Sequence, residues 1–480
     1  MNRQLFGLIV AVVFGAEACA VGPRYHAPDL SVPSGWSNAS LRGTNVDTVQ
    51  NESWWEGFRD PELIRLIDQA VAANQDVKLA TARVEEARAV TGVVKSGLAP
   101  QVGVSASAAR VRQRTFTAGT ENGEQSLRVV PIEINNFEGR FDASWELDVF
   151  GRVRSQLAAA RADVIASEED RRDVLVVVLS DVARWYADVR GLQLRISIAR
   201  QNSHTAQEAV TLTEARRQAG LVTDLDVARA RAQFESTEAA IPLLEAARAA
   251  AVHRLGALIG SAPGTLEQEL TQVAPVPLIP PQVPVGLPSD LLKRRPDVRR
   301  AEAQLIAATA RIGVAKADYF PRFTLTGNAG RQATQLHDLT LGFSNVFGFG
   351  PSISLPIFTA GRIRSNVAVQ EARVRQSSAT YQSTVLRSLE ETENALVNFA
   401  REQDRRDRLE AQMTQDQLVL ELATAQYTAG LTDFLSVLDA ERALYGSQDS
   451  LAQSQTAIVT HLVTVYKALG GRWTVLDDTK

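Results

Sequence analysis

Apolar and polar residues alternate without a break over the segment FEGRFDASWELDV, residues 137–149. Its odd-numbered positions are apolar or glycine. The positions between them are Glu138, Arg140, Asp142, Ser144, Glu146 and Asp148. A period of two puts these two sets on opposite faces of a β-strand. The segment therefore predicts a strand with one apolar face and one ionic face.

Three further segments with this alternation are predicted strands, at about 101–114, 322–330 and 347–357. Turn-rich segments at 117–136 and 332–345 are predicted to be the loops that join each pair of strands. Each predicted strand has about the length that a tilted strand needs to cross a bilayer.

A helical pattern fills two long segments without proline, 151–219 and 361–429. The first carries apolar residues at alternating spacings of four and three, which is typical of a coiled-coil seam. These residues are Val178, Val182, Trp185, Val189, Leu192 and Ile196. A helix of this length would measure about 100 Å at about 1.5 Å per residue. Only a coiled coil, a bundle or a helical barrel could bury the stripe of such a rod.

The long segments belong to an internal duplication. Gly-Arg-Val-Arg-Ser at 151–155 returns as Gly-Arg-Ile-Arg-Ser at 361–365, and Ala-Gly-Leu at 219–221 returns at 429–431. Each pair of landmarks is separated by 210 positions (361 − 151 and 429 − 219). Two copies of one structural unit are therefore predicted.

The duplication predicts the following division of the chain. A signal peptide (1–18) and an extended arm (19–60) precede the first repeat (61–260), which ends in a helix at 221–259. A connector with eight prolines (261–296) leads to the second repeat (297–471), which ends in a helix at 431–469, and to a tail (472–480).

The first residues have the pattern of a secretory signal, with Arg3, a short apolar run at 5–16 and small residues before Cys19. Cys19 stands where a bacterial lipoprotein signal would be cut and its thiol acylated. The alternative is a plain cleaved signal that leaves Cys19 unmodified. No later segment approaches 18 consecutive apolar residues, so no membrane-spanning helix is predicted.

The composition of the chain excludes several kinds of binding site and catalytic site. The net charge of −4 argues against nucleic-acid binding, and a single cysteine excludes an intrachain disulfide and a thiolate zinc cluster. The five histidines are scattered, and the chain carries no nucleotide-binding loop or nucleophile motif. We therefore expect no enzyme activity, no cofactor and no metal site.

Four strands cannot close a barrel, and an open sheet edge cannot face lipid. Several protomers would have to share one barrel, and three would give twelve strands. In that arrangement the apolar face meets lipid, and the ionic face lines water. The lumen residues would be Glu138, Arg140, Asp142, Glu146 and Asp148. An amphipathic strand in a soluble sandwich is the alternative.

Several segments together resemble the outer-membrane factors of bacterial tripartite efflux pumps, the TolC/OprM family, and in particular its lipoprotein branch. The segments are CAVGPRYHAP, WWEGFRDPEL, NQDVKLATARVEEAR, LPSDLLKRRPDVRRAEAQL, YTAGLTDFLSVLDAERAL and the two GR-[VI]-RS landmarks. The resemblance implies an α+β fold in a homotrimer. A twelve-stranded barrel in the outer membrane would continue into a periplasmic helical barrel. It also implies a periplasmic adaptor protein and an inner-membrane pump of RND type as partners.

The repeated turns end the long helices. By the resemblance, they would contact helical hairpins of the adaptor. This role would fall to Gly220, Leu221 and Val222 in the first turn and to Gly430, Leu431 and Thr432 in the second. The alternative is that these residues only build turns.

Leu435 and Asp439 lie four positions apart, so they share one helix face. The resemblance places that face in the pore, with Leu435 in an apolar ring and Asp439 in a ring of carboxylates. It also implies a hydrogen bond from Tyr427 to Asp226 that closes the tip. Thr432 stands where some members have an arginine, so we expect no closure network built on an arginine there. The alternative for Asp439 is a solvated coiled-coil charge.

The leading hypothesis is an outer-membrane exit duct that passively conducts small molecules delivered by the adaptor and the pump. A duct for protein secretion or for metal efflux is the alternative within the same fold. A secreted coiled-coil scaffold without a pore is the alternative from a different class.

Overall fold

The computed structural model describes residues 21–37, 42–45, 53–121 and 124–471, and at 118–121 and 124–128 it describes the backbone alone. The chain forms two compact units. Of the described residues, the first takes those within 21–28, 85–165 and 303–379, and the second takes those within 29–84, 166–302 and 380–471. Each unit therefore draws on both predicted repeats. Cys19, the predicted signal and the predicted tail lie outside the described residues.

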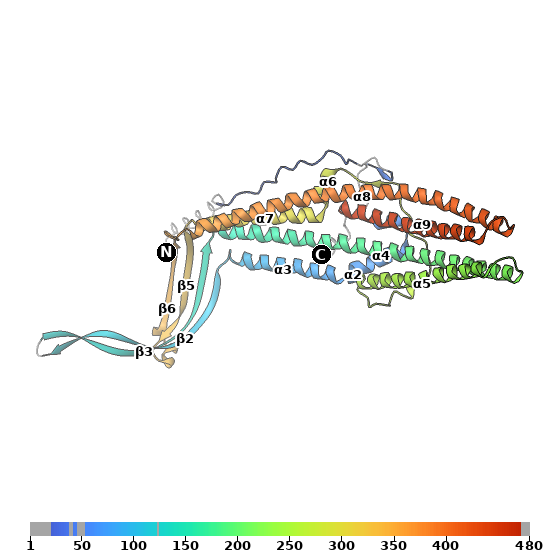
Figure 1. Cartoon of the computed structure of the whole chain (residues 1–480). Coiled ribbons are helices and arrows are strands. Elements are labelled where there is room, and N and C mark those ends of the chain that lie inside the picture. Colours follow the sequence, from blue (N-terminus) through green and yellow to red (C-terminus); the bar gives the residue numbers. More distant parts are fainter. Residues whose placement is uncertain (1–20, 38–41, 46–52, 122–123, 472–480) are drawn as a thin grey trace. The chain divides into compact units, whose positions relative to one another are not determined.

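The first unit contains an antiparallel sheet in the order β2-β3-β5-β6 (Figure 1). Its strands are β2 (Gln101–Glu121), β3 (Glu124–Leu147), β5 (Arg322–Ala333) and β6 (Asn345–Ser354). Between β5 and β6 lie two short 3-10 helices, η4 (Leu336–Thr340) and η5 (Gly342–Ser344). Parts of α3 (Gln75–Ser96), α4 (Arg152–Gln218), α7 (Pro296–Ala317) and α8 (Arg362–Thr428) complete this unit.

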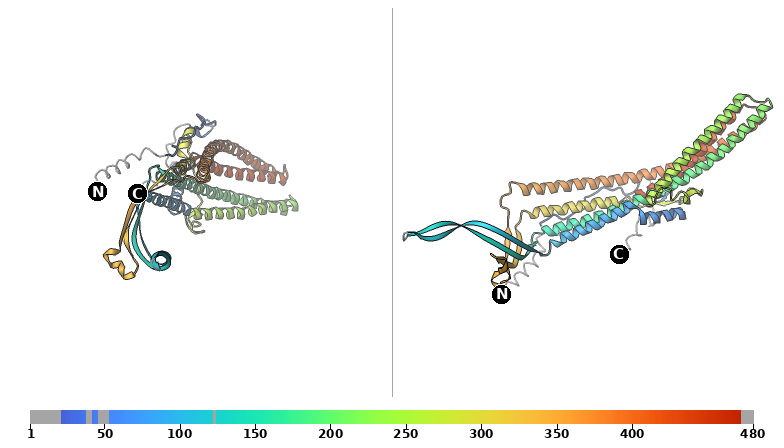
Figure 2. Two further views of the ribbon diagram at one scale, coloured as in Figure 1. Left: turned by 90° about the vertical axis from the view of Figure 1, so that its left-hand side faces the viewer. Right: turned by 90° about the horizontal axis from the view of Figure 1, so that it is seen from below.

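The prediction of a loop at 117–136 is wrong, because β2 and β3 stay paired from Gln101–Ser144 out to Glu121–Glu124. The segment is rich in β-branched residues, such as those of RVVPIEI at 128–134, which favour a strand. Figures 1 and 2 show this hairpin extending beyond β5 and β6 as a two-stranded ribbon.

Two strand ends also differ from the prediction. The strand predicted at 137–149 ends at Leu147, and the strand predicted to reach 357 ends at Ser354. Pro356, which cannot donate a ladder hydrogen bond, follows the second end.

The second unit is mainly helical. In it, α4 and α5 (Asp224–Leu258) form one antiparallel hairpin, and α8 and α9 (Phe434–Ala468) form another (Figures 1 and 2). The shorter elements are η2 (Trp54–Phe58), α2 (Pro61–Ala73), η3 (Glu269–Thr271) and α6 (Pro288–Arg294). Two strands of two residues each, β1 (Thr44–Asn45) and β4 (Val283–Pro284), pair in parallel.

The core of this unit gathers apolar residues from all of its helices. Leu66, Leu179 and Leu462 are fully buried, and the ring of Trp54 stacks on Tyr466 with 5.2 Å between centroids. Among the described residues, no helix combines the length and apolar character required to cross a bilayer.

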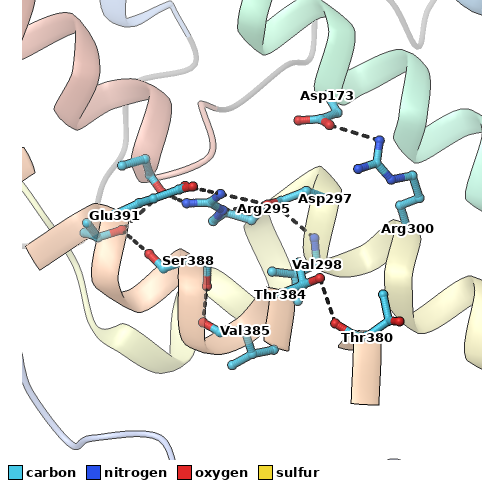
Figure 3. Close-up of polar contacts among 12 residues, drawn as sticks. Asp173, Arg295, Asp297, Val298, Arg300, Thr380, Thr384, Val385, Ser388 and Glu391 are labelled. Carbon is cyan, nitrogen blue, oxygen red and sulfur yellow. Dashed lines mark hydrogen bonds and ion pairs between the residues drawn. The ribbon is translucent and has the colours of Figure 1, made fainter. Parts of the chain in front are cut away.

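Arg295 joins three elements beside this core (Figure 3). Its guanidinium donates to the carboxylates of Asp297 and Glu391, both at 2.7 Å, and to the carbonyl of Ala468 at 3.1 Å. Arg295 is only 7% exposed, so these bonds supply the partners that a buried guanidinium requires. The start of α7, the middle of α8 and the end of α9 are thereby fixed together.

Candidate functional site

One face of the sheet is apolar across all four strands. Directly opposed residues share a face, so Phe141 lies beside Val104 on β2 and Ala329 on β5. The large apolar residues of this face are Val102, Val104, Phe137, Phe141, Trp145, Leu147, Phe323, Leu325, Phe347, Phe349 and Ile353, and Arg331 lies at its outer end. Phe347 and Phe349 are 80% and 81% exposed. An exposed apolar face of this extent is typical of a surface that meets lipid or another protein.

The other face of β3 carries an ion-pair ladder. Arg140 lies between Glu138, at 2.7 Å from Nη1, and Asp142, at 2.9 Å from Nε. The hydroxyl of Ser105 on β2 donates to Asp142 at 2.6 Å. Three of the five predicted lumen residues therefore lie side by side on one polar face.

The other two predicted lumen residues hold the junction between β3 and α4. Glu146 accepts two hydrogen bonds from Arg152, at 2.8 and 2.6 Å. Asp148 lies beyond the end of β3, and its carboxylate accepts from the backbone amides of Val153 and Arg154, at 2.9 and 2.8 Å. The first amides of a helix have no partner within the helix, so Asp148 caps α4. The alternation of apolar and polar residues continues to Val149, so the sequence pattern does not mark Asp148 as a helix cap.

The first helical turn connects α4 to α5. Gly220 has a φ of +72°, a conformation that glycine adopts without strain, and Leu221 donates its amide to the carbonyl of Arg216 at 2.9 Å. Asp226 accepts from both the amide and the hydroxyl of Thr223, at 3.1 and 2.9 Å. Leu221 is 66% exposed at the outside of this turn.

The second turn repeats this geometry with different side chains. Gly430 has a φ of +74°, and Leu431 donates its amide to the carbonyl of Gln426 at 2.9 Å. Asp433 caps α9 by accepting from the amide of Ser436 at 3.2 Å. Leu431 is 79% exposed, and the hydroxyl of Thr432 lies 3.0 Å from that of Ser436.

Tyr427 is buried between the two hairpins, and burial raises the pKa of its hydroxyl. The guanidinium of Arg216 lies 4.4 Å from the centre of its ring and donates to its carbonyl at 3.1 Å. The ring of Phe434 lies 5.4 Å away on the second hairpin. Arg216 therefore connects α4 to α8 by a cation–π contact and a hydrogen bond.

The expected hydrogen bond from Tyr427 to Asp226 is absent within one copy of the chain. The carboxylate of Asp226 is taken by Thr223 at the start of its own helix. Among the described residues, the hydroxyl of Tyr427 has no hydrogen-bond partner. No sequence pattern marks Arg216, because basic residues are common in the last turn of any helix, where they interact favourably with the helix dipole.

Leu435 and Asp439 lie on one exposed face of α9. The side chain of Asp439 is 66% exposed, and Arg442 approaches it to 3.9 Å. Val437 and Leu438, on the opposite side, are buried against Tyr427 and Phe434. The structure thus brings Leu435 and Asp439 together, apart from the buried Tyr427.

Glu441 is a buried acid on α9 that the sequence analysis missed. It is 3% exposed, and its Oε2 atom has no hydrogen-bond partner among the described residues. Burial raises the pKa of Glu441 to about 7, and the neighbouring Arg442 opposes that rise. No pattern in the sequence marks it, because a glutamate at this spacing also fits a solvated helix face.

No group of three or more His, Cys, Asp or Glu side chains within the described part of the chain could hold a metal ion.

A sequence profile described as outer membrane efflux protein matches residues 66–261 and 287–471. Nodulation protein T of Rhizobium leguminosarum bv. trifolii is 31% identical, and the match covers 91% of each chain. The solvent efflux pump outer membrane protein SrpC of Pseudomonas putida is also 31% identical, over 96% of this chain and 97% of its own length.

Among solved structures, the outer-membrane channel OprN superposes with a TM-score of 0.86 at 34% identity, over 94% of this chain and 99% of that one. These matches confirm the resemblance drawn from the sequence, together with the predicted outer-membrane location and role in efflux. The chain belongs to the outer membrane efflux protein family.

Proposed function

We propose that three copies of this chain form an exit duct whose wall in the outer membrane is a twelve-stranded barrel. The strand order leaves β2 and β6 as the two edges of the sheet, and these edges run in opposite directions. An edge strand in lipid needs a partner for its backbone groups. Pairing β6 of one copy with β2 of the next is antiparallel, and it closes the barrel with an even number of strands.

Within this duct, the apolar face of the sheet contacts acyl chains, and the ladder of Glu138, Arg140 and Asp142 lines the water-filled lumen. Glu146 and Asp148 lie at the inner end of the lumen, where they fix the start of α4. The ladder supports this assignment, because three charged groups with mutual partners are compatible with water and costly in lipid.

The turns at Gly220, Leu221 and Val222 and at Gly430, Leu431 and Thr432 form the periplasmic tip. The exposed Leu221 and Leu431 offer an apolar surface to a periplasmic adaptor. An inner-membrane pump, of RND type, delivers the cargo through that adaptor. The relatives support these partners, since SrpC is named as the outer-membrane protein of an efflux pump.

Leu435 and Asp439 form the gate of the duct. Around a threefold axis, Leu435 makes an apolar ring and Asp439 a ring of carboxylates, which attracts cations. The exposure of both side chains on one face of α9 supports this assignment. Tyr427 and Asp226 act behind the gate. Tyr427 packs against α4 and α9, and Asp226 forms the capping box with Thr223 at the start of α5.

Small organic molecules are the proposed cargo. Metal efflux is the second candidate, but the chain has only two methionines, Met1 and Met413, and one cysteine. Soft metal ions favour thioether and thiolate ligands. Cys19 is proposed as the site of acylation that anchors the arm to the membrane.

The observation that carries the proposal is the sheet, which is apolar on one face over four strands and polar on the other, where β3 bears the ion-pair ladder. Its test is the conductance of the purified protein in planar bilayers, combined with the mass of the detergent-solubilised complex. Discrete channels from a trimer are expected. A soluble monomer that produces no channel current in the bilayer would contradict the proposal.

A further inference from the structure

The outer part of the β2–β3 hairpin reverses the polarity of its two faces. Up to the pair Ala108–Phe137, the face that carries Val104 is apolar. Beyond that pair, the same face carries Arg110, Arg112 and Arg114, which follow at every second position. We call these three residues the arginine stripe.

The opposite face of the same ribbon is uncharged in its described side chains between Ala109 and Thr115. Val111 lies opposite Ile134, and Gln113 lies opposite Ile132. Val111 and Ile134 line one hollow together with Phe343 of η5 and Val346 of β6. The aliphatic face therefore turns toward the chain itself, and the arginine stripe turns outward.

The arginine stripe begins where the four-stranded wall ends. The pairing of β3 with β5 stops at Phe137–Ala333, and Arg110 follows Ala108 on the next outward position of the same face. This is the end of the wall farthest from the start of β2, where the chain leaves α3. Arg331, opposed to Gly139 on β3, adds a fourth guanidinium to this face.

The charge on this face is only partly neutralised. Glu133 is 2.5 Å from Arg110 and 4.0 Å from Arg112. The side chains of these two arginines are 71% and 70% exposed. One carboxylate among three guanidinium groups leaves a net charge of +2 (3 − 1) on the described part of the stripe.

We propose that the arginine stripe binds the phosphate groups of an acidic glycolipid in the outer leaflet of the outer membrane. Guanidinium groups pair with phosphate oxygens in a bidentate geometry, and basic clusters at a membrane surface attract anionic headgroups. The apolar face of the four-stranded sheet, next to the arginine stripe, contacts the acyl chains of the same lipid. A free phosphate ion has no acyl chain and could not contact that apolar face. The proposal rests on the proposed function, since it requires the apolar face to contact lipid.

The test compares the full-length protein with the variant R110Q/R112Q/R114Q. Each purified protein is titrated with diphosphorylated lipid A and with its dephosphorylated form, and bound lipid is counted by native mass spectrometry. We expect the variant to bind the diphosphorylated lipid at least about tenfold more weakly, since each basic residue near a membrane contributes attraction of its own. The dephosphorylated form should bind weakly to both proteins.

Glu133→Gln is the matched control, because it removes the one acid of this face and keeps all three arginines. It should bind the diphosphorylated lipid about two- to threefold more tightly. Phosphatidylglycerol should bind more weakly than the diphosphorylated lipid, and millimolar inorganic phosphate should not displace it.

Equal binding of the lipid by the wild-type protein and the triple variant would overturn the proposal. So would equal binding of both forms of lipid A, a preference for phosphatidylglycerol, or displacement by inorganic phosphate. Conductance in bilayers of neutral phospholipid is measured in parallel. A wild-type protein that conducts but fails the lipid test contradicts this inference alone, whereas a protein that does not conduct contradicts the duct itself.

Discussion

The two helical turns have the same backbone but different side chains at equivalent positions. Gly220 and Gly430 are 210 positions apart and adopt the same left-handed conformation. The same spacing relates Arg217 to the buried Tyr427, and Arg229 to Asp439. Backbone geometry has thus been kept in both copies, whereas burial and charge have diverged. Under the proposed function, the second copy carries the gate and the first supports it.

The strand-to-helix junctions differ in the same way. In the first copy, Glu146 and Asp148 hold the start of α4 by hydrogen bonds. The equivalent positions of the second copy are Pro356 and Phe358, and Phe358 is 86% exposed. Carboxylates therefore hold the strand-to-helix junction in the first copy, and the equivalent residues of the second copy cannot do so.

The largest expected effect comes from Tyr427. Tyr427→Ala should lower the free energy of unfolding by about 3 kcal/mol, because it empties a buried site between the hairpins. Arg217→Ala, at the equivalent position of the first copy, should change it by less than about 0.5 kcal/mol, since that side chain is exposed. Thermal denaturation followed by helical circular dichroism measures both.

Tyr427→Phe separates the ring from the hydroxyl. It should be nearly neutral, because the hydroxyl has no hydrogen-bond partner among the described residues. If Tyr427→Phe lowered the free energy of unfolding as much as Tyr427→Ala, the hydroxyl would have to form a hydrogen bond, such as the expected one to Asp226.

Glu441 should make stability depend on pH. Its pKa is raised by burial from 4.5 to about 7, so the native state holds the proton more tightly than the unfolded chain. Its contribution is intact below pH 4.5 and is lost as the pH rises through 7. Glu441→Gln should therefore stabilise the protein by about 3 kcal/mol at pH 8 and have little effect at pH 4.

Arg231, the equivalent residue of the first copy, is the control. It is exposed and paired with Glu214 at 2.5 Å, so Arg231→Gln should have a small effect at either pH. A gain from Glu441→Gln that is equal at both values of pH would show that Glu441 does not titrate as its burial implies.

Asp148→Ala should cost about 1–2 kcal/mol, since it leaves the first amides of α4 without their acceptor. Phe358→Ala, at the equivalent junction, should cost less, because that ring is exposed. The measurement is the same thermal denaturation. Equal losses at the two junctions would remove the distinction between the two copies.

The smallest expected effect is on ion selectivity. Asp439→Asn should lower the preference for cations about twofold, and Arg229→Gln should change it less and in the opposite direction. The reversal potential under a potassium chloride gradient measures both. An unchanged potential in Asp439→Asn would place its carboxylate outside the conducting path.

The sequence predicted the elements that have long, regular periods. The alternation around Phe141 and the proline-free stretch from Arg152 to Gln218 each leave one secondary structure possible over many residues. Element ends were predicted less well, because the period of two continues through Asp148 although that residue caps a helix. The partners of Tyr427 could not be predicted, since Arg216 lies 211 positions away and reaches it only through the packing of two hairpins.

The central claim is that one face of the sheet contacts lipid and the other contacts water. Spin labels placed singly at positions 137–146, in protein reconstituted into bilayers, test it most directly. The account predicts that the odd-numbered sites are accessible to oxygen in the lipid and the even-numbered sites to a water-soluble nickel complex. Equal access of the nickel complex to odd and even sites would contradict it.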